Sequence, residues 1–197
     1  VLTIKETKAP KGYKLDTKTY THTVTSGENL ISVSDIPIFD PPFVLTKVDK
    51  DTTTPQGDAT FSGAVFKWEY FPNNDWRGTP ARVWYFATDT SGRCVYSKDY
   101  LAPGYTSDAL YVSPANVNQL PLGTVKITEV KNSLGYTVIP NSLYCTIAED
   151  SSKASGAKHI WTEESKAILT QMANGDWGVY EPIDTNLFGS VSIDKFD

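Results

Sequence analysis

The stretch Thr-Val-Lys-Ile-Thr-Glu-Val-Lys-Asn-Ser-Leu-Gly-Tyr at residues 124–136 decides the expected fold. It is typical of a strand that ends near Glu129 and continues into a Gly-Tyr turn. Residues 3–13 have almost the same pattern, Thr-Ile-Lys-Glu-Thr-Lys-Ala-Pro-Lys-Gly-Tyr. Glu129 follows Glu6 by 123 residues (129 − 6), and the same spacing separates the two Gly-Tyr pairs. A repeat with one constant spacing predicts two copies of one structural unit.

The composition favours β-structure and limits the function classes. The chain has 197 residues, a formal net charge of −5 and 12% aromatic residues. Aromatic and β-branched residues are enriched in strands. The negative charge and scattered lysines argue against nucleic-acid binding, and no apolar run is long enough to span a membrane. Cys94 and Cys145 do not have the spacing of a metal site. We expect no metal and no other cofactor. The two cysteines are either buried thiols or a disulfide.

Alternating apolar residues and turn signals predict many short strands separated by loops. Between 151 and 176 this pattern is interrupted by a polar stretch, a capping-box spacing that starts at Thr162, and a short helix predicted over 167–173. The remaining segments are predicted as strands, at 2–6, 17–24, 30–34, 43–49, within 61–70, and at 82–88, 93–97, 109–112, 122–129, 142–147 and 177–183.

A second repeat sets the expected domain boundaries. Lys195-Phe196-Asp197 matches Lys47-Val48-Asp49 at a spacing of 148 residues (195 − 47), and the apolar residues before each also match. We therefore expect residues 1–41 to be the C-terminal part of a module. Residues 42–188 form a complete module with an insertion near 151–176, and residues 189–197 form the first strand of a following module. The predicted fold class is all-β, with antiparallel immunoglobulin-like (prealbumin-like) sandwich modules in tandem.

Taken in order, these motifs resemble the Cna B-type, SpaA-like domains of Gram-positive surface adhesins and pilins. The resemblance rests on the Lys47-Val48-Asp49 strand, the segment Ser-Gly-Ala-Val-Phe at 62–66, and the repeated Glu and Gly-Tyr motif. It also rests on an acidic residue ahead of each lysine strand. It covers nearly the whole chain outside about 151–176.

The resemblance implies a covalent amide bond inside the sandwich. Lys47 would be the nucleophile and Glu129 the proton shuttle, with Glu6 as the equivalent in the partial module. Asp184 is the predicted acceptor, with Glu181 and Asn186 as alternatives. Burial disfavours the charged form of an amine, and a buried protonated carboxyl can donate a hydrogen bond to the group under attack. Holding the groups in contact supplies the effective molarity that the reaction needs.

The partial modules contain half sites. Residues 1–41 have Glu6 and Asp35 but no lysine strand, and residues 189–197 have Lys195 without partners. Pairing of Lys195 in one copy with Asp35 in another would give head-to-tail self-association through a heterologous contact.

The function implied by the resemblance is that of a structural or adhesive module in a cell-wall-anchored, extracellular protein. Its partners would be adjacent modules of the same protein and a host or glycan ligand. The alternative is a carbohydrate- or protein-binding sandwich without a cross-link, which would use Trp76 and Trp161. No conventional catalytic motif is present, so we expect no enzyme beyond a single intramolecular amide formation.

Overall fold

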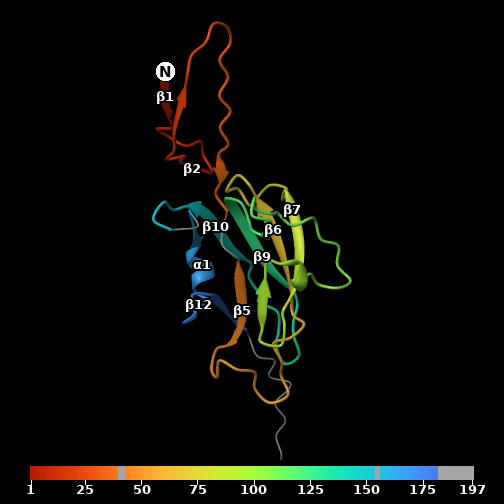
Figure 1. Cartoon of the computed structure of the whole chain (residues 1–197). Coiled ribbons are helices and arrows are strands. Elements are labelled where there is room, and N and C mark those ends of the chain that lie inside the picture. Colours follow the sequence, from red (N-terminus) through yellow and green to blue (C-terminus); the bar gives the residue numbers. More distant parts are fainter. Residues whose placement is uncertain (40–42, 154–155, 182–197) are drawn as a thin grey trace, which may run out of the picture.

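The computed structural model describes residues 1–39, 43–153 and 156–181, apart from the side chain at 181. In these ranges the chain is almost entirely strands and loops, with one four-residue α-helix and one 3₁₀ turn. Figure 1 shows a β-sandwich body with a narrow N-terminal segment projecting from one end. The all-β prediction is therefore confirmed.

The body consists of two packed sheets. The five-stranded sheet has the order β11-β10-β9-β6-β7 and the four-stranded sheet has the order β12-β13-β5-β8. Alternating apolar residues face the space between the sheets, as expected for a sandwich. The first sheet comprises β6 (Val65–Phe71), β7 (Arg82–Ala87), β9 (Gly123–Lys131), β10 (Leu143–Glu149) and β11 (Ala157–Trp161). The second comprises β5 (Val44–Asp49), β8 (Arg93–Val95), β12 (Leu169–Gln171) and β13 (Trp177–Glu181).

The first and last strands of the body are neighbours and run parallel. Strand β13 pairs with β5 over five positions, from Trp177 beside Leu45 to Glu181 beside Asp49. The other strand pairs are antiparallel. The predicted antiparallel sandwich is therefore confirmed, and β5 with β13 is its one parallel pair among the described strands. Because the two strands run the same way, β5 begins at the end of the body near the N-terminal segment, and β13 ends at the opposite end.

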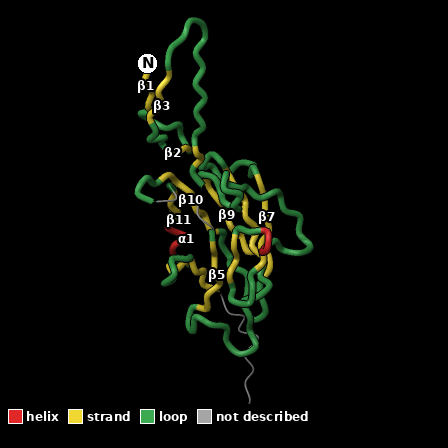
Figure 2. The backbone as a smooth tube through the Cα atoms, in the orientation of Figure 1, coloured by secondary structure: helices red, strands yellow, loops and turns green. Residues whose placement is uncertain are grey.

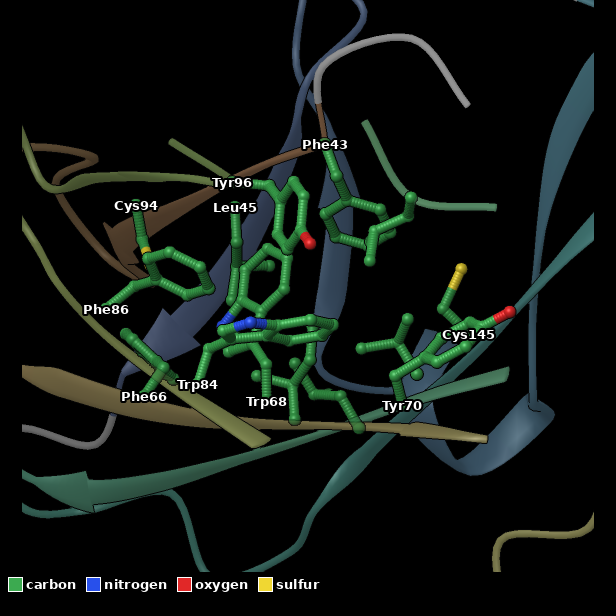
Figure 3. Packing of buried hydrophobic residues seen from close by; sticks show 14 of the residues in the cluster. Phe43, Leu45, Phe66, Trp68, Tyr70, Trp84, Phe86, Cys94, Tyr96 and Cys145 are labelled. Atoms are coloured by element: carbon green, nitrogen blue, oxygen red, sulfur yellow. The ribbon is translucent and has the colours of Figure 1, made fainter. Parts of the chain in front are cut away.

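Aromatic side chains fill most of the core. Trp68 and Trp84 are completely buried, and the rings of Phe43 and Tyr96 pack edge-on against them. Figure 3 shows these rings packed together with aliphatic side chains and both cysteines. Each fully buried apolar side chain contributes about 1.5–3 kcal/mol, so this aromatic cluster is the main stabilising feature of the body.

The segment expected as an insertion contributes edge strands to both sheets. Strand β11 pairs with β10, and β12 pairs with β13. Helix α1 is limited to Glu163–Lys166 and begins at Thr162, whose side chain accepts a hydrogen bond from the Ser165 N–H. The helix predicted over 167–173 is wrong, because pairing with β13 holds residues 169–171 as a strand.

The N-terminal segment is mostly loop (Figure 2). Strand β1 (Leu2–Lys5) pairs with β3 (Thr19–His22), and β2 (Tyr13–Lys14) pairs with β4 (Ile36–Pro37). The strand predicted at 30–34 is absent; the chain becomes a strand only at β4, where β2 provides a partner. Likewise, 109–112 contains only a single bridge, from Val112 to Asn118.

The two copies of the repeat have the same backbone structure. Leu2 pairs with His22, and Val125 pairs with Cys145, each position being 123 residues further along. The turn glycines have φ values of 85° at Gly12 and 89° at Gly135, a left-handed conformation that favours glycine. The N–H of the tyrosine after each glycine donates to the carbonyl three residues earlier. The sequence repeat is therefore also a structural repeat.

Candidate functional site

Lys47 lies in the middle of β5 with its side chain directed into the sandwich. Strand β5 is buried along its whole length, and Lys47 itself is 1% exposed. Its neighbour on β13 is Val179, and its backbone N–H donates to the carbonyl of Gly92 on the other side. A lysine is almost never buried in this way unless it is paired.

Glu129 comes from β9 in the opposite sheet and meets this lysine. The Lys47 Nζ lies 2.9 Å from the Glu129 Oε1, and both side chains are completely buried. The second carboxylate oxygen, Oε2, accepts a hydrogen bond of 2.7 Å from the backbone N–H of Ile139. The structure therefore brings together the two residues that the sequence selected, and it fixes the carboxylate through both oxygens.

Tyr136 lies beside the pair and contacts Asp49. The Lys47 Nζ lies 5.5 Å from the centre of the Tyr136 ring, and the Tyr136 hydroxyl donates to Asp49 Oδ2 at 3.2 Å. Burial opposes ionisation of Asp49, but hydrogen bonds from the N–H groups of Asp51 and Thr52 and from Gln56 outweigh it and lower the pKa of Asp49. Tyr136 and Asp49 both belong to the sequence motifs, but the sequence did not predict that they lie near Lys47.

The half site in the N-terminal segment is also assembled in part. Glu6 and Asp35 line one small cavity together with Asp16 and Tyr20. The N–H of Asp16 donates to Glu6 Oε2, which is the same bond, shifted by 123 residues, that Ile139 makes to Glu129. The hydrogen bond to Asp16, partial burial, and the charges of Asp16, Asp35 and Glu6 raise the pKa of Tyr20.

Three of the predicted site residues cannot be placed. Asp184, Asn186 and Lys195 lie outside the described residues. For Glu181 only the backbone is described; it ends β13, beside Asp49 and two residues after the neighbour of Lys47.

The two candidate ligand-binding tryptophans lie in different environments. Trp76 is 37% exposed, and its ring lies 5.3 Å from that of Tyr144. Trp161 is only 3% exposed and packs against Phe43 and Trp177 in the core, so it offers no face to a ligand. In the sequence, Trp161 lies in the region 151–176 where the strand pattern is interrupted. In the structure it ends β11, and its ring lies inside the sandwich.

The cysteines are buried in the core as reduced thiols, Cys94 on β8 and Cys145 on β10. Burial raises the pKa of the Cys94 thiol, which disfavours the reactive thiolate. Within the described ranges, no group of three or more His, Cys, Asp or Glu residues is arranged to hold a metal ion. The same ranges contain no helix of the length and hydropathy that a membrane crossing requires.

Comparison with known proteins finds likenesses among solved structures alone. No family model matches the chain, and a search of curated proteins found no match. The chain is similar to the crystal structure of the pilus 2b backbone protein of group B streptococcus, with 19% identity and a TM-score of 0.41 over 86% of this chain. It spans about half, 48%, of the length of that protein.

Proposed function

We propose that this chain is a load-bearing structural module of an extracellular, cell-wall-anchored surface protein of the pilin or adhesin kind. We further propose that its sandwich is closed by an amide bond from Lys47. The observation that carries the proposal is the completely buried contact between Lys47 Nζ and Glu129 Oε1 at 2.9 Å. An ion pair of this kind is a weak source of stability, because the desolvation of both groups offsets their attraction. The pair joins β5, the first strand of the body, to β9 in the opposite sheet, a position that suits a reacting pair.

The proposed reaction joins the amine of Lys47 to a side-chain carboxyl group near the end of β13. The nitrogen–carbon bond forms as the carbon–hydroxyl bond of the acid breaks, and one water leaves. Glu129 takes the proton that the nitrogen loses and returns it to the departing hydroxyl. The hydrogen bond from Ile139 holds the carboxylate of Glu129 in place for both steps.

The strand arrangement supports a mechanical role. Force applied along a chain of such modules would enter the body at β5 and leave it at β13, at opposite ends. These strands are parallel neighbours joined over five positions, so pulling on them shears the whole ladder at once instead of opening it pair by pair. An amide from Lys47 to the region after β13 would then carry the load covalently. If the acceptor is Asp184, the closed loop spans 137 residues (184 − 47), which in the entropy model contributes about 5 kcal/mol.

Intact mass measured after denaturation tests the bond. We expect the purified chain to be lighter than its sequence by one water, and the Lys47→Arg variant to have its full mass. A full mass for the parent chain would refute the cross-link.

Fragment mapping identifies the acceptor. The sequence repeat predicts Asp184, and Glu181 is the alternative acid because its backbone ends β13 two residues after Val179, the neighbour of Lys47. Loss of water is common to both, and loss of ammonia would identify Asn186. Tandem mass spectrometry of the linked peptide separates the two acids, and Asp184→Ala and Glu181→Ala serve as matched variants.

A second candidate function rests on Trp76, whose exposed ring beside Tyr144 could stack on a sugar. This alternative predicts that binding to a glycan array is lost in Trp76→Ala and kept in Lys47→Arg. If the array shows no Trp76-dependent binding, this alternative fails.

A further inference from the structure

The outer face of the five-stranded sheet carries two pairs of aromatic rings. Side chains alternate along a strand, so Tyr144 of β10 and Tyr85 of β7 point away from the core that their neighbours fill. The ring of Tyr144 lies 5.3 Å from that of Trp76. The ring of Tyr85 stacks on that of Tyr105 at 4.8 Å, with 25° between the planes. Trp76 is 37% and Tyr105 39% exposed, so each pair has one ring that reaches solvent.

A polar strip lies between the two aromatic pairs. In the strand register, Tyr144 lies beside Lys126, and Lys126 lies beside Glu69. Lys67, two residues before Glu69, lies beside Tyr85. The strip therefore crosses β10, β9, β6 and β7, which are neighbours in the sheet (Figure 1). Neighbouring strands lie about 4.8 Å apart, so Tyr144 and Tyr85 are separated by about 14 Å. An occupant that touches both pairs must be an extended chain.

The strip has an excess of positive charge. The carboxylate of Glu69 is shared by two lysines, with Lys67 Nζ at 2.8 Å from Oε1 and Lys126 Nζ at 3.5 Å from Oε2. Each lysine side chain is 29% exposed and that of Glu69 only 12%, so the ammonium groups face the solvent. An ammonium group has three N–H donors, and the ion pair with Glu69 does not use them all. Two lysines against one glutamate thus complement an anionic group, although the whole chain has a net charge of −5.

The sheet edge next to the strip is closed to a peptide strand. The N–H of Val83 donates to Asp108 Oδ2 at 2.6 Å, and the N–H of Tyr85 donates to Ser107 Oγ at 2.9 Å. The carbonyl of Tyr85 accepts a hydrogen bond of 2.8 Å from the Ala102 N–H. A peptide that extends a sheet needs such backbone groups for its own pairing. The face therefore offers aromatic rings and side-chain donors, which suit a sugar chain, and not main-chain pairing.

We propose that this face binds an extended oligosaccharide that carries a carboxylate on a central sugar. The two aromatic pairs stack on sugar rings at the ends, because an aromatic side chain presents a flat apolar surface. Lys67 and Lys126 bind the carboxylate through charge-assisted hydrogen bonds. The hydroxyls of Thr128 and Ser142, 2.7 Å apart beside the strip, are available to sugar hydroxyls. The inference rests on the second candidate function, because Trp76 belongs to one of the two pairs.

Titration calorimetry of the full chain with acidic hexasaccharides tests the proposal. The probes are hexasaccharides of hyaluronan, polygalacturonate and polysialate, with the neutral chitin hexasaccharide as reference. We expect at least one acidic probe to bind, and its carboxyl-reduced form to bind at least about ten-fold more weakly. Raising the salt from about 50 to about 500 mM should weaken the binding, because exposed charges are screened. No binding of any acidic probe at millimolar concentration, or equal binding of the acidic and carboxyl-reduced forms, would overturn the proposal.

Variants of the aromatic pairs separate this proposal from a site at Trp76 alone. Trp76→Ala and Tyr105→Ala should each weaken binding of the same probe by about five- to ten-fold. Tyr13→Ala is the matched control and should bind like the parent, since Tyr13 is as exposed as Tyr105 but lies in the N-terminal segment. Parent-like binding by Tyr105→Ala would overturn the two-pair site. If Trp76→Ala still lost binding, the second candidate function would stand without it.

A lysine variant tests the polar strip. Lys126→Gln should bind the acidic probe no better than the parent binds its carboxyl-reduced form. Lys166→Gln, which removes an exposed ion-paired lysine from α1, is the matched control and should leave the affinity unchanged. Parent-like affinity in Lys126→Gln would overturn the assignment of the carboxylate to the strip. None of these results affects the intact mass, so the cross-link of Lys47 and the sugar site fail separately.

Discussion

The two copies of the strand-and-turn unit have the same backbone and different environments. In both, the strand pairs in the same register, the turn glycine has a positive φ, and a backbone N–H ten residues further on donates to the glutamate. Yet the turn tyrosine is 1% exposed at Tyr136 and 39% exposed at Tyr13. The local sequence thus determines the unit, whereas burial and the lysine come from β5 and the strands that pack with it.

This difference separates a half site from a complete one. A glutamate in water is an ordinary carboxylate, whereas a buried one must be paired. Glu129 meets that requirement through Lys47, and both side chains are completely buried, which excludes water. Glu6 is only partly covered, and its carboxylate accepts a hydrogen bond from the Asp16 N–H.

Removing the glutamate should give the largest difference in unfolding free energy between the two copies. Glu129→Ala leaves Lys47 as an uncompensated buried charge, which typically costs about 3–5 kcal/mol. Glu6→Ala removes a partly exposed carboxylate and should cost less than about 1 kcal/mol. Denaturant unfolding followed by tryptophan fluorescence measures both, since the five tryptophans all lie in the body. Equal losses of unfolding free energy in the two variants would mean that Glu129 and Glu6 do not differ in burial.

Acid should destabilise the body through Asp49. Its pKa is lowered in the folded chain, so its contribution is present above the unfolded value of about 4 and is lost as the pH falls through the folded value. Asp49→Asn should reduce stability at neutral pH by about 1–3 kcal/mol and flatten the decline in acid. Asp16→Asn, in the exposed segment, is the control and should leave the unfolding of the body unchanged. A parent-like acid profile in Asp49→Asn would contradict this assignment.

The smallest effect is expected from replacing the turn glycine. The local strain is the same in both copies, but its consequence for the body differs. Gly135→Ala and Gly12→Ala each force alanine into a left-handed conformation, at about 1 kcal/mol. Only Gly135→Ala should lower the unfolding free energy of the body. Gly12→Ala should instead speed hydrogen exchange at the Tyr13 amide, which donates to Pro10. If Gly12→Ala destabilises the body as much as Gly135→Ala, the segment and the body unfold together.

Much of the fold could be predicted because strand alternation is a local property. The strands around Lys47 and Glu129 lie where the apolar pattern placed them, and Thr162 begins a helix as its capping spacing indicated. The failures depended on distant partners. Residues 169–171 form a strand because β13 lies beside them, and residues 30–34 do not because no described strand pairs with them there.

The site could be predicted only in part for the same reason. A repeated glutamate and a repeated lysine strand pointed to Lys47 and Glu129, whose contact joins residues 82 positions apart. The parallel pairing of β5 with β13 has no signature in the sequence, yet it places Val179 beside Lys47 and the backbone of Glu181 two residues further along. The burial of Trp161 likewise follows from the position of β11 in the sheet.

Intact mass of three denatured proteins tests the central claim most directly. The claim is that the copy in the body is a complete reacting site and the N-terminal copy is not. The parent chain and Glu6→Gln should both be lighter than their sequences by one water, whereas Glu129→Gln should keep its full mass. A full mass for the parent, or a loss of water that depends on Glu6 and not on Glu129, would contradict the account.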